Sequence, residues 1–173
     1  MNLRLALCVV AILVAVGALT GACGGDGKTV TLEEYFERLE AADDDADEQS
    51  QAIEDRFPNA FVEVGETQEY LDAFVDLVRD FVATLEDINA PAEAEDAHRE
   101  AVAAGREYSE ALEDASSQFR DVESDEELEQ TTTTVFGEQS DFTAADQRFT
   151  SSCIGLQTLA DENDIDIDLD CEE

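Results

Sequence analysis

The chain has 173 residues, of which 45 are Asp or Glu and only 9 are Lys or Arg, so its formal net charge is −36 at pH 7. This charge excludes proteins that bind the phosphate backbone of nucleic acids, because such proteins neutralise phosphates with clustered Lys and Arg. It also disfavours direct contact with anionic lipid headgroups. Two interpretations are left: a heavily solvated surface, which we favour, or a surface that attracts cations or a cationic partner.

The first 22 residues have the three zones of a secretory signal peptide. Arg4 supplies the basic start, residues 5–16 form an unbroken apolar run, and small residues follow. A retained transmembrane helix is the weaker alternative, because the apolar run is short for a bilayer and no Lys- or Arg-rich flank follows it. We therefore expect residues 1–22 to be a signal peptide.

The segment Leu19-Thr20-Gly21-Ala22-Cys23 closes this signal. It resembles the lipobox of bacterial lipoproteins, with Thr20 at the position where Leu is commonest. The resemblance implies cleavage between Ala22 and Cys23 and lipidation of Cys23. It therefore implies a protein that is lipid-anchored to the cell membrane and faces the extracytoplasmic side, with residues 23–30 as the lipidated Cys and a flexible tether.

Two of the four cysteines are left for a disulfide bond. Cys8 would be lost with the signal peptide and Cys23 would carry the lipid, which leaves Cys153 and Cys171. An even pair of cysteines in an exported protein predicts a disulfide. The loop that it closes would stabilise the fold by about 3 kcal/mol in the chain-entropy description.

Residues 31–162 carry four amphipathic helical patterns, which predict an all-α fold, an antiparallel four-helix bundle. The first pattern starts at a capping box of Thr31 and Glu34 and ends before Pro58. Its acidic middle, residues 43–48, is weak and favours a kink or frayed turn. The second pattern, residues 66–88, has the broadest apolar face and should form the centre of the core.

The third pattern has Pro91 in its first turn and an alanine-lined face that allows close helix packing. The fourth starts at a capping box of Ser124 and Glu127 and continues to residue 162, with a break expected near Gly137. Apolar and acidic residues alternate in the tail, residues 163–173. This alternation predicts an extended acidic tail whose apolar face lies against the protein. The disulfide would hold this tail back along the last helix.

Few residues of the chain are candidates for binding a metal ion. Glu95 and His98, the only histidine, have the Glu-x-x-His spacing of carboxylate-bridged metal bundles, but such sites need a second motif that the chain lacks. We therefore predict no metal site and keep Glu95 and His98 only as weak candidate ligands. The alternating Asp residues of the tail match the start of an EF-hand loop, but Leu169 occupies the glycine position. We interpret them, and residues 43–48, as solvated acidic faces.

The sequence predicts no catalytic residue and no cofactor, since it has neither a phosphate-binding glycine loop nor a nucleophile elbow. The mature part resembles small helical bacterial lipoproteins without an assigned function. We expect a non-enzymatic interaction or envelope-structural module, whose partner would be an envelope protein or a cationic molecule and not a nucleic acid. The alternative is a helix bundle that binds a ligand or a metal cation.

Overall fold

The computed structural model describes residues 30–171. The predicted signal peptide, Cys23 and most of the tether lie outside these residues. The described part contains five helices and no strand: α1 (Leu32–Arg56), α2 (Val64–Asp87), α3 (Glu95–Phe119), α4 (Asp125–Val135) and α5 (Asp141–Glu162). The prediction of an all-helical fold is therefore confirmed, with five helices in place of the expected four.

Helix α1 begins at the predicted capping box. The Thr31 hydroxyl accepts from the Glu34 N–H at 3.1 Å, and the Glu34 carboxylate accepts from the Thr31 N–H at 3.2 Å. The helix continues without interruption to Arg56, so the frayed turn allowed for residues 43–48 is absent. Packing at both ends of α1, through Tyr35 and Phe57, outweighs the charge repulsion of its middle.

The predicted core helix is α2. It buries Leu71, Val75, Val78, Val82 and Leu85 at helical spacing. The turn that precedes it is irregular in a way that the sequence did not indicate: Phe61 has a φ of 66°, and its N–H donates to the buried Thr67 hydroxyl in the first turn of α2 at 2.9 Å.

Helix α3 starts four residues later than Pro91. Residues 91–94 form a turn in which the Ala94 N–H donates to the Pro91 carbonyl, so the placement of Pro91 inside the helix was wrong. The alanine-lined face is confirmed, because Ala101, Ala104 and Ala115 are buried. Gly105 adds to it: a Cβ there would lie 3.1 Å from the Val82 side chain and 3.4 Å from Phe149.

The expected fourth helix is divided into α4 and α5 at the predicted place. Ser124 caps α4 by accepting from the Glu127 N–H, but the Glu127 carboxylate bonds to the Glu123 N–H, one residue before the position that a capping box requires. Gly137 lies in the break, where a Cβ would come within 2.7 Å of the Thr133 carbonyl oxygen. Ser140 then caps α5.

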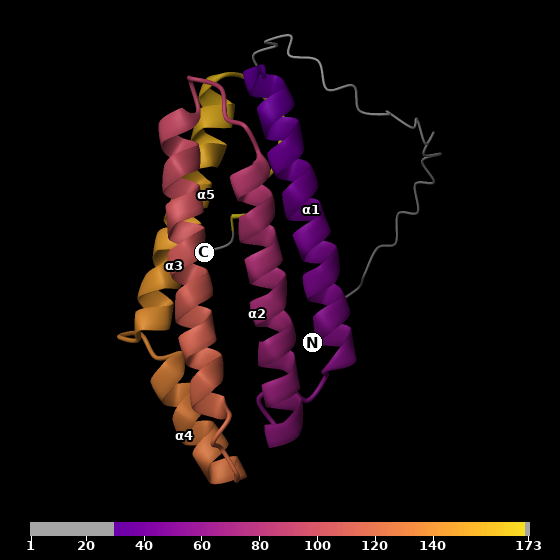
Figure 1. The fold of residues 1–173 in the computed structure, drawn as a ribbon, viewed down its shortest axis with the longest axis vertical. Helices are drawn as coiled ribbons and strands as arrows, with labels where there is room; N and C mark the ends of the chain where they lie inside the picture. Colours follow the sequence, from indigo (N-terminus) through magenta and orange to yellow (C-terminus); the bar gives the residue numbers. More distant parts are fainter. Residues whose placement is uncertain (1–29, 172–173) are drawn as a thin grey trace, which may run out of the picture.

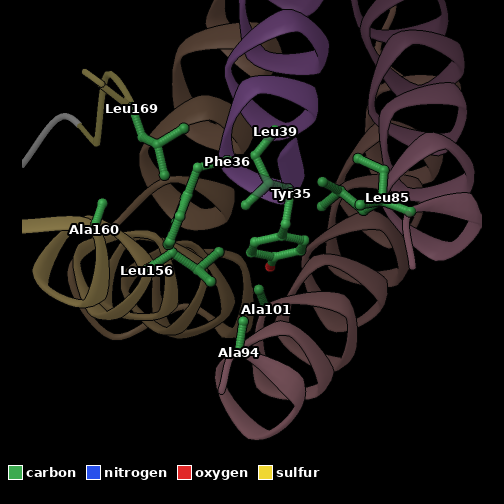
Figure 2. Close-up of a cluster of buried hydrophobic side chains, with 10 residues drawn as sticks. Tyr35, Phe36, Leu39, Leu85, Ala94, Ala101, Leu156, Ala160 and Leu169 are labelled. Carbon is green, nitrogen blue, oxygen red and sulfur yellow. The ribbon is translucent and has the colours of Figure 1, made fainter. Parts of the chain in front are cut away.

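Helix α2 packs between α1 and α3, and α3 also contacts α5 and α4 (Figure 1). Buried side chains gather in three clusters along this assembly. One lies near α4 around Phe119 and Leu128, and one lies midway around Val78 and Leu112. Figure 2 shows the third, where α1, α2, α3, α5 and the tail converge; its labelled members are Tyr35, Phe36, Leu39, Leu85, Ala94, Ala101, Leu156, Ala160 and Leu169.

The tail returns along α5 as an irregular segment. A disulfide joins Cys153 to Cys171 with a Cα–Cα distance of 5.6 Å, as predicted. Leu169 is buried, whereas the alternating Asp164, Asp166, Asp168 and Asp170 are exposed. The Gln157 side chain holds the tail backbone, because its amide donates to the Ile167 carbonyl and accepts from the Leu169 N–H, at 3.1 and 2.9 Å.

Candidate ligand groove

A groove of about 650 Å³ lies between α1 and α5, with side chains of α2, α3 and α5 forming its floor and the tail closing one end. Its position follows from the sequence of α1. Between Leu39 and Ile53, alanines are the only apolar residues of this helix. The middle of α1 therefore cannot fill the space beside α5, and apolar surface of the floor stays uncovered.

The floor is aromatic. Phe74 and Phe81 come from α2, Tyr108 from α3 and Phe149 from α5, and all four are only half-buried. The Tyr108 and Phe149 rings are stacked with centroids 5.5 Å apart, and Phe81 meets Phe149 edge to face at 6.2 Å. Burial raises the pKa of the Tyr108 hydroxyl, which therefore stays neutral at ordinary pH.

The edges of the groove carry negative charge. Asp43, Asp47 and Glu54 come from α1, Asp146 from α5 and Asp170 from the tail. Among the described residues that line the groove there is no Lys, Arg or His. Burial raises the pKa of Asp43 to about 6 and also raises the pKa of Asp146. Asp43 therefore differs from the freely solvated residue that the sequence indicated.

The tail connects the two sides of the groove at its closed end. The disulfide fixes Cys171 to α5, and the Asp170 N–H donates to the Asp43 carboxylate on α1 at 3.1 Å. Both cysteines and Leu169 line this end of the groove. The predicted disulfide pair thus belongs to the wall of the candidate site.

The predicted weak metal ligands lie elsewhere, at the start of α3. The His98 Nδ1 atom is 3.2 Å from the hydroxyl of Tyr35, a fully buried residue that no sequence motif indicated. Burial lowers the pKa of His98, and Glu95 is exposed. Within residues 30–171 no three His, Cys, Asp or Glu side chains are grouped so that they could hold a metal ion. Ala22 and Cys23 lie outside the described residues.

Searches of protein-family models, curated proteins and solved structures find no match for this chain. In the described part of the chain, no helix is both long and apolar enough to cross a membrane.

Proposed function

We propose that this protein is a lipid-anchored, extracytoplasmic binding module without enzymatic activity, which holds an apolar or amphipathic ligand in the groove between α1 and α5. Its long helices α1, α2, α3 and α5 would form the antiparallel four-helix bundle, with α4 as an appendage at one end. The observation that carries the proposal is the groove itself. The aromatic side chains of its floor are only partly buried, and exposed apolar surface of this kind is typical of binding sites.

The volume of the groove supports a ligand of small-molecule size. Small-molecule sites usually measure about 300–1,000 Å³ and are lined by apolar and aromatic side chains with a few polar groups. The groove, at about 650 Å³, has this composition. This is why we favour the binding of a ligand over a purely structural role in the envelope.

The anchor rests on the sequence. Lipidation at Cys23 would hold the domain permanently, since two or more acyl chains give stable membrane binding. Residues 24–30 would then separate the membrane from a domain whose negative charge repels anionic headgroups.

A neutral, environment-sensitive dye, N-phenyl-1-naphthylamine, tests the groove. The full-length protein should enhance its fluorescence, and Ala46→Trp, which fills the groove from α1, should abolish the enhancement. Ala41→Trp is the matched control, because Ala41 is exposed on the same helix and does not line the groove. Equal dye binding by both variants would contradict a ligand site in the groove.

Membrane fractionation tests the anchor. We expect the protein to partition into the detergent phase, and Cys23→Ser to block processing or release the protein. An N-terminal peptide beginning at Cys23 without lipid, seen by mass spectrometry, would contradict the anchor.

A further inference from the structure

We infer that the ligand of this groove is a small amphipathic organic cation, with an apolar or aromatic body and a protonated amine or quaternary onium group. This inference rests on the proposed function and names its ligand class. It combines two properties of the groove: aromatic rings on the floor, and carboxylates, with no basic side chain among the described lining residues, along the edges.

The floor suits the apolar body. Phe81, Tyr108 and Phe149 form a continuous aromatic surface through the edge-to-face and stacked contacts at 6.2 and 5.5 Å. A cation held over such rings is attracted by their negative faces, by about 0.5–2 kcal/mol per contact, depending on desolvation. The floor therefore attracts both parts of an amphipathic cation.

The edges suit the charged group. Asp43 on α1 and Asp146 on α5 face the groove from opposite sides, and both are only partly exposed. Withdrawal from water strengthens the attraction of a carboxylate for a cation. Three arginines of the described residues are paired with carboxylates outside the groove: Arg79 with Glu113, Arg106 with Glu86 and Arg148 with Glu107. They therefore do not take the place of a cationic ligand beside Asp43 and Asp146.

The same charges argue against other occupants. Fatty acids and phospholipids would bring a carboxylate or phosphate among five acidic side chains. A second copy of the chain would bring another net charge of −36. A cation with an apolar body is the ligand that satisfies both the floor and the edges.

A pair of ions with the same shape and opposite charge tests the inference: tetraphenylphosphonium and tetraphenylborate. Their binding to the full-length protein in zwitterionic lipid nanodiscs is measured by equilibrium dialysis, with protein-free nanodiscs as the blank. We expect tetraphenylphosphonium to bind and tetraphenylborate to stay at the blank level. Asp43→Asn with Asp146→Asn should weaken tetraphenylphosphonium binding by about tenfold or more, equivalent to about 1.4 kcal/mol.

The matched control is Asp55→Asn with Asp80→Asn, which removes the same charge from exposed positions on α1 and α2 outside the groove. It should bind tetraphenylphosphonium as the unaltered protein does. Equal weakening in both double variants would mean attraction by overall charge and would overturn the inference, as would binding of tetraphenylborate. If dye binding in the groove persists in that case, the proposed function stands and only the cationic class of ligand fails. If Ala46→Trp does not affect dye binding, the proposed function itself fails.

Discussion

The contact between α2 and α3 and the gap between α1 and α5 are two solutions to the same packing problem. At the first, Val82 meets Gly105 and the alanine-lined face of α3, and the helices approach closely. At the second, polar and acidic residues occupy the middle of α1, and a groove of about 650 Å³ is left. The difference lies in the side chains that each helix presents to its neighbour.

Charged side chains also differ between the α2–α3 contact and the groove. Ion pairs run along the outside of the closed contacts, where Arg79 bonds to Glu113 and Arg106 to Glu86 between α2 and α3. The groove has carboxylates on both edges without an arginine among its described lining residues. Opposite charges here accompany tight packing, whereas uncompensated charge accompanies the open surface.

The largest effect is expected from removing packing at the closed contact. Leu112 is 1 % exposed, and Leu112→Ala should lower the free energy of unfolding by about 3–4 kcal/mol, because it leaves a cavity. Gln51→Ala, which shortens a side chain in the groove, should cost less than about 0.5 kcal/mol. Urea denaturation followed by circular dichroism measures both, and equal losses would remove the distinction between the two regions.

Breaking the closed end of the groove comes next. Cys153→Ser with Cys171→Ser removes a bridge between residues 18 apart and should cost about 3 kcal/mol. The Leu169 amide should also lose protection from hydrogen exchange, because its bond to Gln157 depends on the position of the tail. A reducing agent should destabilise the unaltered protein and leave this variant unchanged. Retained Leu169 protection in the variant would show that the tail does not need the bridge.

A smaller effect is expected from neutralising one edge of the groove. Burial raises the pKa of Asp43 from 3.8 to about 6, and the neighbouring Asp47, Asp170 and Asp44 act in the same direction, whereas the Asp170 N–H opposes them. The folded protein therefore binds a proton more tightly than the unfolded chain does. The stability that Asp43 contributes is present below about pH 4 and is lost as the pH rises through about 6.

Asp43→Asn should remove this loss, since the amide stays neutral and keeps an oxygen that accepts from Asp170. At pH 7.5 we expect a gain of about 1 kcal/mol, allowing for the screening of a half-exposed group, and at pH 3.5 almost none. Thermal unfolding at the two pH values measures the difference. A gain of equal size at both would refute the assignment to Asp43.

The smallest effect is expected from the ion pairs of the closed contact. Arg106 and Glu86 are 58 % and 40 % exposed, and pairs of this kind contribute little to stability. Arg106→Gln should therefore leave the urea midpoint almost unchanged. A loss as large as that of the cysteine variant would show that charge, and not packing, closes this contact.

Much of the helical structure could be predicted from the sequence, because it depends on local patterns. The start of α1 at Thr31, the core stripe of α2 and the break at Gly137 follow from capping, periodicity and propensity. The pairing of Cys153 with Cys171 followed from counting cysteines. Each of these inferences needs only residues that are near in sequence or few in number.

The groove could not be predicted, because it depends on which helix faces meet. Phe74 and Phe81 belong to the same periodic stripe as the buried Val78, and only the weak middle of α1 leaves them half-covered. Asp43 looks like its solvated neighbours until the tail, 127 residues away in the chain, lies against it. The absence of large apolar residues between Leu39 and Ile53 was the available signal, and it pointed to a kink as readily as to a groove.

The attachment of the tail through Gln157 has an evolutionary consequence. The Gln157 amide bonds to main-chain atoms of Ile167 and Leu169, so it places little demand on the identity of the exposed side chains next to them. The exposed Asp166 and Asp168 are therefore free to drift among polar residues, whereas Gln157 has few substitutes with both a donor and an acceptor at the same reach. Selection on this end of the groove should act mainly on the helix that holds the tail, and only weakly on the tail itself.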